Sequence, residues 1–269
     1  MREIINIYWF MTDNIGDKMS GVSSYFNFPL PVRTIDIKQA LARKDELKDK
    51  FIILGGGGHI HLPSLDYNNQ KFEFLEEIAT LSPWTVIWGL GNNIHNTKTH
   101  LYPKCLDDYM LVGLRDLDSP YEYVPCPSCM SPYLDHSYQD VVSTTSFIFK
   151  HKFSENFISA DSYLIPYIHL CENETSMQQV INKMKRAHTI FTDSYHGAYW
   201  GLLLNKTVVV PNPYSSKFYS LHPNLIIKGE KQKGHIEDMS NYLSLCRQAN
   251  ISFYAKVLEK VFEYGASSD

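Results

Sequence analysis

Short apolar runs of strand length alternate along this chain with amphipathic segments of helix length. In the first half, such runs occupy Ile4–Phe10, Val32–Ile37 and Phe51–Leu54. The alternation is typical of βαβ units, which build a parallel sheet covered by helices. We therefore expect an α/β fold. Open α/β sheets bind ligands beyond the carboxyl ends of their strands, so the segments that follow each strand are the first candidates for functional residues.

Prolines divide this alternation into two halves. They are frequent in and beside the segment 121–132, which stops the strand–helix pattern there. The pattern resumes at Thr145–Lys150. We therefore expect two Rossmann-like domains that face a cleft, residues 1–138 and residues 139–269, with a final helix at Phe253–Tyr264 that packs back on the first domain. The other predicted elements are strands at Thr85–Gly89, Tyr109–Leu114, His188–Thr192 and Thr207–Val210, and helices at Lys18–Phe26, Phe72–Leu81, Ser176–Ala187, His196–Leu204 and Glu237–Arg247.

The composition is that of a globular protein without a strong charge bias. Of 269 residues, 44% are hydrophobic and 20% are charged, which is enough to bury a core without disulfide or metal cross-links. The net charge of −4 argues against nucleic acid as a partner, because a phosphate backbone calls for a basic surface. No apolar stretch reaches the roughly 18 residues that a membrane-spanning helix needs. The five cysteines have no disulfide-framework spacing, so we expect a soluble, cytoplasmic protein.

Four consecutive glycines, Gly55–Gly58, directly follow a buried strand. Without Cβ atoms, their backbone N–H groups can form an anion-binding concavity, and a merely flexible loop is the alternative. His59 and His61 follow at once, but no third metal ligand stands at a recognisable spacing. Cys126 and Cys129 have C-x-x-C spacing but no second pair. We therefore predict a ligand-binding loop and no metal site.

Three more strand ends carry polar residues. The segment Asn14-Ile15-Gly16-Asp17 follows the first strand and predicts either a turn with a helix cap or a loop that approaches a ligand. The segment after Trp88 carries two amides, Asn92 and Asn93, which can donate to and accept from sugar hydroxyls. Arg115 follows another strand and can bind a carboxylate or phosphate in a bidentate manner, or form an internal salt bridge with a neighbouring aspartate.

The segment Ile190–Ala198 has the most concentrated signal. It contains a strand end, a polar turn and the start of a helix, with His196 in the first helical turn. Helix N-termini favour anions, and a histidine can carry a proton near neutral pH; a buried structural histidine is the alternative. Because both segments follow buried strands, we predict that Gly55–Gly58 and Thr192–Gly197 face one another.

The order of these motifs resembles that of the polysaccharide pyruvyl transferase family. The motifs are N-x-G-D, strand–GGGG, W-G-x-G, R-D-x-x-S, and T-D-S-Y-H-G-A followed by N-K-T-V-V-V-P, within residues 14–211. The resemblance implies two Rossmann-like domains of the glycosyltransferase-B type. It also implies transfer of a pyruvyl group from phosphoenolpyruvate to two hydroxyls of a sugar, which gives a cyclic ketal. Many members have Arg two residues before the histidine, whereas this chain resembles other members in having Ser194 there.

The resemblance and the chemistry of the donor assign roles to residues. His196 is the expected acid/base, and Asp17 is the second expected catalytic residue, which binds or activates the acceptor. Phosphoenolpyruvate carries a phosphate and a carboxylate, so its site needs several cationic or N–H donors, and no metal or cofactor is required. The expected donor-binding residues are Arg115, Ser194, Tyr195, Gly197 and Lys206, with Lys217 as an alternative lysine. The expected acceptor or loop-binding residues are Asn14, Gly16, Gly56, Gly57, Gly58, His59, Asn92 and Asn93.

The expected partner is a sugar or a lipid-linked oligosaccharide, with peripheral association at a membrane surface left open and no nucleic acid. The sequence predicts no oligomeric state. Two other functions stay open. One is a nucleotide-sugar-dependent glycosyltransferase on the same architecture, since fold does not determine function. The other is a catalytically silent glycan-binding protein, which would bind glycan without turnover of any donor.

Overall fold

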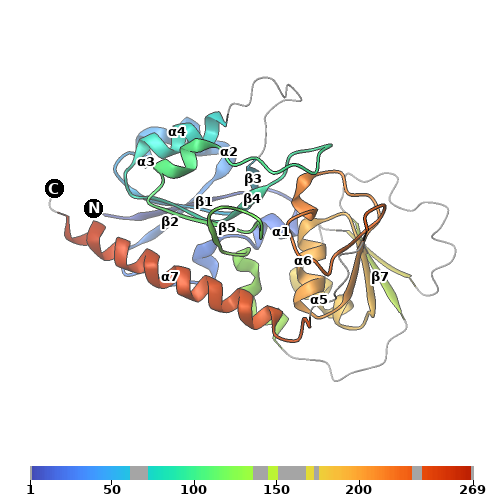
Figure 1. The fold of residues 1–269 in the computed structure, drawn as a ribbon. Coiled ribbons are helices and arrows are strands. Elements are labelled where there is room, and N and C mark those ends of the chain that lie inside the picture. The colour runs from blue at the N-terminus through green and yellow to red at the C-terminus, as the bar shows by residue number, and fades with distance from the viewer. Residues whose placement is uncertain are drawn as a thin grey trace.

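Two parallel β-sheets organise the chain (Figure 1). The computed structural model describes residues 2–60, 72–135, 145–150, 168–172, 176–231 and 238–267. The first sheet has the strand order β2-β1-β3-β4-β5-β6 and the second the order β11-β10-β9-β7-β8. Every strand pair within the described residues is parallel. The α/β class is therefore as expected, and the two sheets are consistent with two Rossmann-like domains.

The strands are β1 (Ile4–Tyr8), β2 (Val32–Asp36), β3 (Phe51–Ile60), β4 (Thr85–Asn92), β5 (Leu111–Leu114), β6 (Glu122–Tyr123), β7 (Ser146–Lys150), β8 (Ile168–Glu172), β9 (Thr189–Thr192), β10 (Thr207–Val210) and β11 (Ile226–Ile227). The α-helices are α1 (Ile15–Lys18), α2 (Ile37–Ala40), α3 (Lys44–Leu47), α4 (Glu73–Leu81), α5 (Met177–Lys185), α6 (Tyr195–Leu203) and α7 (Tyr242–Ala266). Short 3-10 turns include η1 (Val22–Ser24), η4 (Pro127–Met130) and η7 (Ser216–Phe218).

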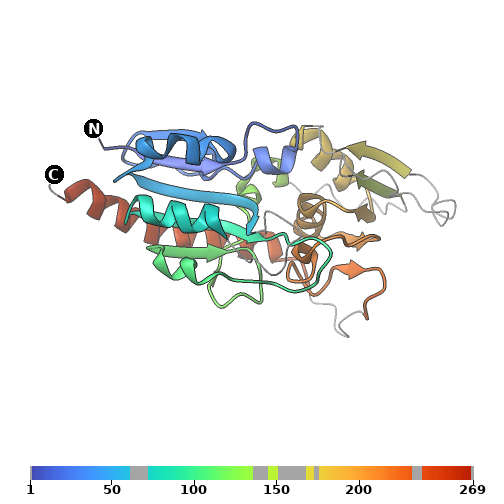
Figure 2. The same ribbon diagram turned by 90° about the horizontal axis from the view of Figure 1, so that it is seen from above.

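Consecutive residues of the central strands point to opposite faces of the first sheet. Ile4 and Phe51 pack in a hydrophobic cluster with α7, whereas the next residues, Ile5 and Ile52, pack in a cluster with α2, α3 and α4. These helices lie on opposite faces of the sheet (Figures 1 and 2). A parallel sheet that is covered on both faces needs apolar residues at nearly every strand position. This burial explains why β1 and β3 are almost continuous apolar runs in the sequence.

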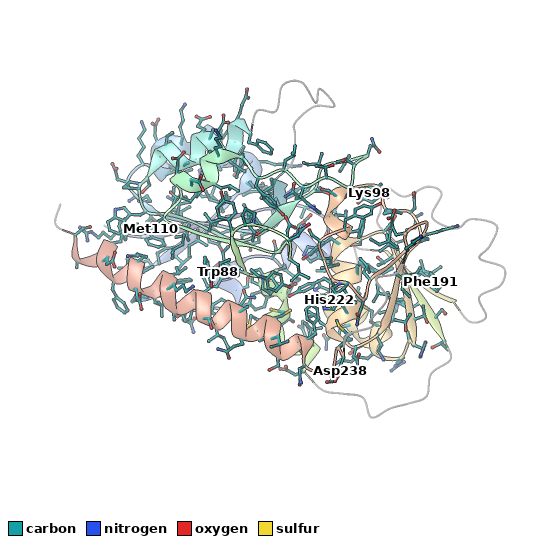
Figure 3. All side chains as sticks on the ribbon, viewed as in Figure 1. Trp88, Lys98, Met110, Phe191, His222 and Asp238 are labelled. Atoms are coloured by element: carbon teal, nitrogen blue, oxygen red, sulfur yellow. The ribbon has the colours of Figure 1, made fainter. Side chains whose placement is uncertain are left out.

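The C-terminal helix is longer than the sequence pattern indicates. The pattern predicts two helices, at Glu237–Arg247 and Phe253–Tyr264, but α7 runs without a break through the residues between them. The apolar pattern is interrupted there by Asn250, which is fully buried. Its Oδ1 accepts a hydrogen bond from Trp88 Nε1 at 2.8 Å, and its Nδ2 donates to the carbonyl of Pro125 at 3.1 Å. Figure 3 shows Trp88 between the first sheet and α7.

The four glycines form part of a strand rather than a loop. β3 continues through Gly55–Gly58 and pairs with β4, with a register shift between Gly57 and Ile60. Gly56 and Gly57 have φ angles of 73° and 98°, which residues with a side chain rarely adopt. The glycines therefore allow an irregular strand end to stay paired. The segment is therefore a paired strand end and not the free loop that the sequence predicts, and its contact with a ligand stays a prediction.

The helix expected at Lys18–Phe26 is also different in the structure. It is replaced by α1, which ends at Lys18, and by the single turn η1. Gly21 stands between the two elements, and a Cβ atom on it would lie 2.4 Å from the ring of Tyr8. The chain thus uses a glycine, which disfavours a continuous helix, to pass close to β1. β3 and β4 extend beyond the predicted strands. The predicted elements that correspond to β1, β2, β5, β7, β9, β10 and α4–α6 begin and end within two residues of the expectation.

Connections cross between the two sheets. β6 ends the first sheet at Tyr123 and β7 begins the second at Ser146, and the expected domain boundary at residues 138–139 lies outside the described residues. The segment around η4 packs with α5 and α6 in the core of the second sheet, although it follows β6 in the chain. α7 follows the second sheet in the chain and packs on the first. The short strands β6, β8 and β11 have no counterpart in the sequence-based expectation.

We expect the substitution Asn250→Ala to lower the free energy of unfolding by about 2–3 kcal/mol, because Trp88 Nε1 and the carbonyls of Pro125 and Cys246 each lose a partner. Denaturant unfolding of the purified protein measures this. The control is Gln248→Ala on the exposed face of the same helix, for which we expect a change within about 0.5 kcal/mol. Equal effects of the two substitutions would contradict the role of Asn250.

Candidate functional site

Charged side chains gather in a buried position where the two sheets meet. Arg115 follows β5, His196 lies in the first turn of α6, Asp17 in α1 and Lys217 in η7. All four are less than a tenth exposed. Each of Asp17, His196 and Lys217 has its pKa shifted by the charge of Arg115. Charged groups are seldom buried unless they are paired or functional, so we treat these four residues and Tyr195 as one site, the Arg115 cluster.

Arg115 is the centre of the cluster. Its backbone N–H donates to the carbonyl of Leu90 at 2.8 Å, which holds the residue at the ends of β4 and β5. The side chain is 2% exposed, and its Nε and Nη1 atoms have no hydrogen-bond partner among the described residues. The internal salt bridge considered for this arginine is not among the ion pairs of the described residues. Arg115 is thus a buried cation with hydrogen-bond donors that are free to bind an acceptor.

The guanidinium lies over the aromatic ring of Tyr195. The carbon Cζ of Arg115 is 3.5 Å from the ring centroid, a distance at which a cation–π attraction operates. This contact joins the end of β5 in the first sheet to the first residue of α6 in the second. The hydroxyl of Tyr195 is also buried and has no hydrogen-bond partner among the described residues. The cluster therefore offers a second polar group to a ligand.

Two glycines give the guanidinium its space. A Cβ atom on Gly91 would lie 2.6 Å from Arg115 Nε, and one on Gly58 would lie 3.1 Å from Arg115 Nη2. The irregular ends of β3 and β4 thus come close to the arginine because they lack side chains. Gly58 and Tyr195 both lie against Arg115, which confirms that the glycine segment and the turn before α6 come together.

Lys217 is the second buried cation of the cluster. Its Nζ donates a hydrogen bond to the hydroxyl of Tyr214 at 2.5 Å and lies 4.2 Å from the centroid of that ring. Burial and the charge of Arg115 lower the pKa of Lys217 to about 7, against the opposing effect of Asp193 and Asp17. The ammonium group is therefore half charged near neutral pH. A bound anion would favour its charged form.

His196 is enclosed by its neighbours. Its Nε2 lies 3.4 Å from Cys126 Sγ, and a Cβ atom on Gly16 would lie 2.0 Å from its Nδ1. Burial, with the charges of Arg115 and Lys217, lowers the pKa of His196 well below its ordinary value. The imidazole is therefore neutral at physiological pH. Because one ring nitrogen faces Cys126 and the other faces Gly16, the ring packs α1 against α6.

Asp17 has the ionisation behaviour of an acid/base group. Burial raises the pKa of Asp17 to about 6, although Arg115 and Lys217 oppose the shift. A carboxyl with this pKa is partly protonated at neutral pH, the condition for efficient proton transfer. With 9% of its surface exposed, Asp17 is also the most accessible of the four ionisable residues Asp17, Arg115, His196 and Lys217.

Helix capping occupies several of the predicted ligand-binding groups. The side chain of Asn14 accepts from the N–H of Gly16 at 3.0 Å and caps α1. The hydroxyl of Ser194 accepts from the N–H of Gly197 at 3.4 Å and caps α6. A Cβ atom on Gly197 would lie 2.3 Å from Thr192 Oγ1, so this glycine permits close packing of α6 on β9. These residues position the cluster, and their contact with a donor stays a prediction.

The two amides after β4 are engaged within the protein. Asn92 donates from its side chain to Asp116 at 3.1 Å and accepts from the backbone of Leu101 at 3.0 Å. The side-chain oxygen of Asn93 accepts from the hydroxyl of Ser215 at 3.0 Å and so joins β4 to the segment before η7. Both amides thus make their hydrogen bonds within the protein, and the predicted contact with a sugar stays a prediction.

The remaining predicted residues lie at different distances from the cluster. His59 stands beside Gly57 at the end of β3, next to the cluster but not in it, and Gly56 packs against Ser20. Lys206 precedes β10 and donates to the carbonyl of Lys185. Because the strands are parallel, this position is at the amino end of the second sheet, opposite to Arg115. The structure therefore brings Lys217, and not Lys206, to the cluster.

Sequence reasoning missed three contributors to the site. Asp193 is 2% exposed and influences the pKa of Lys217; its place at a strand end was the available signal. Tyr214 holds Lys217, and no motif marks it. Cys126 contacts His196, and its C-x-x-C spacing suggested only metal or redox chemistry. Within the described residues, no group of three or more His, Cys, Asp or Glu side chains could hold a metal ion.

Comparison with known proteins adds no family assignment. No family model matches the chain, and no curated protein sequence matches it. In the part of the chain that the structure describes, no helix is long and apolar enough to cross a membrane. The function is therefore argued from the Arg115 cluster and from the order of the motifs.

We expect Gly16→Ala to destabilise the protein by about 1–3 kcal/mol, because the new methyl group would overlap the buried ring of His196 and force α1 away from α6. Thermal and denaturant unfolding measure the effect. Gly265→Ala is the matched control, since a Cβ atom there has no neighbour within 4 Å. In α7 this control substitution should stabilise the protein by about 0.5–1 kcal/mol. Opposite signs are expected, and a neutral Gly16→Ala would refute the close contact.

Proposed function

We propose that the protein is a pyruvyl transferase, which uses phosphoenolpyruvate to form a ketal on a sugar of a polysaccharide or glycan precursor. The observation that carries the proposal is the buried guanidinium of Arg115, whose Nε and Nη1 have no partner among the described residues. A buried donor without a partner costs about 1–3 kcal/mol, and more when it is charged. Arg115 therefore calls for an anion that carries several acceptor oxygens.

Phosphoenolpyruvate matches this demand because it carries two anionic groups. Arg115 and Lys217 supply two cations in one buried cluster, and Arg–phosphate or Arg–carboxylate pairs are among the strongest polar contacts in proteins. The order of the motifs supports the identity of the donor. On this proposal the fold is of the glycosyltransferase-B type, with the donor at the junction of the sheets, and the protein acts in the cytoplasm.

The reaction has a simple balance. A proton adds to the methylene carbon of phosphoenolpyruvate, and the first sugar hydroxyl attacks the adjacent carbon that carries the phosphate. Phosphate then leaves, and the second hydroxyl attacks the same carbon and closes the ketal. The two hydroxyl protons are recovered as one proton on the new methyl group and one on the phosphate. The protein must therefore supply and accept protons beside a bound anion.

We assign this proton transfer to Asp17. Its pKa of about 6 leaves a protonated fraction at neutral pH. The sequence pattern favours His196 as the first acid/base, but the lowered pKa and the contacts of its ring suit a residue that positions α1 and α6. In this proposal Asp17 transfers the proton, and His196 holds α1 and α6 in position.

We expect Arg115→Met to weaken phosphoenolpyruvate binding by about tenfold to a hundredfold, the loss of a charge-assisted hydrogen bond to a buried anion. Isothermal titration calorimetry measures it. Arg43→Met is the control, because Arg43 lies on the surface in an ion pair with Glu46. If phosphoenolpyruvate does not bind the wild type and a nucleotide sugar does, the glycosyltransferase function replaces our proposal. If neither binds, the silent glycan-binding function does.

We expect phosphoenolpyruvate affinity to fall about tenfold between pH 7 and pH 8.5, because Lys217 loses its charge above its lowered pKa of about 7. The sign follows from the cation: it is present below this pH and is lost above it, while the phosphate stays ionised. Calorimetry at several pH values tests this. Lys217→Met should abolish the pH dependence, and Lys206→Met, at the other end of the sheet, should retain it. Loss of the dependence in Lys206→Met instead would move the second cation away from Lys217.

A further inference from the structure

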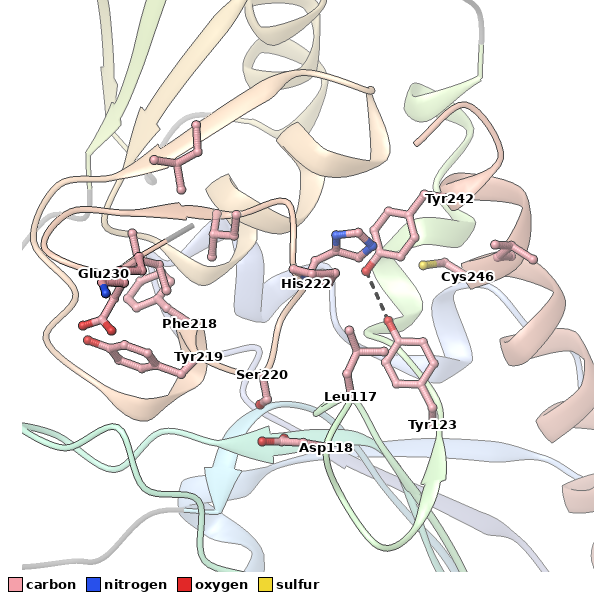
Figure 4. Close-up of a pocket in the computed structure, with 16 residues that line it drawn as sticks. Leu117, Asp118, Tyr123, Phe218, Tyr219, Ser220, His222, Glu230, Tyr242 and Cys246 are labelled. Atoms are coloured by element: carbon pink, nitrogen blue, oxygen red, sulfur yellow. Dashed lines mark hydrogen bonds between the residues drawn. The ribbon is translucent and has the colours of Figure 1, made fainter. Parts of the chain in front are cut away.

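A cavity of about 650 Å³ lies beside the Arg115 cluster. Three parts of the chain line it: residues from Leu117 to β6, residues from η7 to Lys231, and the first turns of α7 (Figure 4). Its volume is in the range of pockets that hold small molecules. None of its lining residues belongs to the Arg115 cluster, so the cavity is a separate site that the proposed donor does not use.

The walls of the cavity combine aromatic rings with hydroxyl groups. Tyr123 and Tyr242 share a hydrogen bond between their hydroxyls at 3.2 Å, and the ring of His222 stands edge-on to Tyr242 at 4.6 Å between centroids. Tyr219 and Phe218 line the opposite side (Figure 4). Aliphatic side chains complete the wall. Such a surface can bury the apolar face of a ring while its polar tips remain available for hydrogen bonds.

The charged groups of the cavity favour an uncharged ligand with hydroxyl groups. Two carboxylates and one lysine, Lys231, line it. Asp118 also lies 3.3 Å from His100 Nδ1, and Glu230 is paired with Lys98. Ser220 adds a hydroxyl. Ionised carboxylates only accept hydrogen bonds, so they suit the O–H donors of a sugar, and two carboxylates against a single lysine disfavour a phosphate. The Arg115 cluster has the opposite preference.

Two segments of the chain contribute residues to both the cavity and the Arg115 cluster. Lys217 belongs to the cluster and its neighbour Phe218 lines the cavity. Arg115 belongs to the cluster and Leu117 lines the cavity. The backbone N–H of Leu117 donates to the carbonyl of Ser220 at 2.9 Å, which joins the two segments. Two residues that line the cavity are thus one or two positions along the chain from Lys217 and Arg115, the cations of the cluster.

We propose that this cavity is an acceptor subsite that binds one uncharged pyranose ring of a glycan. The proposal rests on the proposed function, because an acceptor hydroxyl has to reach a donor held by Arg115. It places the sugar between η7, β6 and α7, and not at the amides of Asn92 and Asn93. These two side chains form hydrogen bonds with Asp116 and Ser215 of the same chain. Aromatic rings hold the face of the sugar, and Asp118 accepts from its hydroxyls.

Saturation-transfer NMR with the methyl glycosides of glucose, galactose, mannose and N-acetylglucosamine tests the proposal. We expect saturation transfer to at least one glycoside in the wild-type protein. Leu245→Trp should abolish it, because Leu245 lines the cavity with 65% of its surface exposed, so a larger side chain can fill the space without disturbing a core. Ile251→Trp, also exposed on α7 but not among the cavity residues, is the matched control and should leave the signal unchanged.

Asp118→Asn should weaken binding of the responding glycoside by about tenfold, through loss of a charged acceptor. The proposal is overturned if no glycoside responds, or if Leu245→Trp and Ile251→Trp behave alike. It is also overturned if Leu245→Trp abolishes phosphoenolpyruvate binding, since the cavity would then belong to the donor site. Failure of the proposed function is a different result: glycosides would bind in the cavity while phosphoenolpyruvate binds nowhere.

Discussion

The buried charge of Arg115 is the constraint on which the rest of the site depends. A cation removed from water is expensive unless a partner compensates it, and this one has Nε and Nη1 without a partner among the described residues. The ring of Tyr195 covers one face of it. The arginine follows β5 of the first sheet, and the tyrosine begins α6, which packs on the second sheet. The contact that compensates the buried charge therefore lies at the junction of the two sheets.

Close packing makes this junction specific. Gly16 allows α1 to meet the ring of His196, and Gly91 allows β4 to meet the side chain of Arg115. α7 ties the two sheets together as well, since its first turns enter the core of the second sheet and its later turns cover the first. The same arrangement brings the Arg115 cluster and the aromatic cavity within a few residues of each other along the chain, as the proposed two-substrate reaction requires.

The sequence predicted the elements better than the roles of their residues. Strand-end position alone identified Arg115 and the turn before α6, because ligands gather at the carboxyl ends of parallel strands. The same reasoning predicted a loop at Gly55–Gly58, whereas this segment continues β3 and pairs with β4. It also could not choose between Lys206 and Lys217, because the choice depends on which end of the sheet each lysine occupies.

The sequence by itself determined the α/β class and the positions of most strands, because periodicity and apolar runs are local properties that burial on both faces imposes. Only the tertiary structure decided which polar groups are free and how they ionise. Asn92 resembles a ligand-binding amide in the sequence but is held by Asp116. Burial acts in opposite directions on an acid and a base: it raises the pKa of Asp17 and lowers that of His196. For this reason the proposed acid/base is Asp17 and not His196, which the sequence favours. Desolvation depends on neighbours that are distant in the chain, so no local pattern records it.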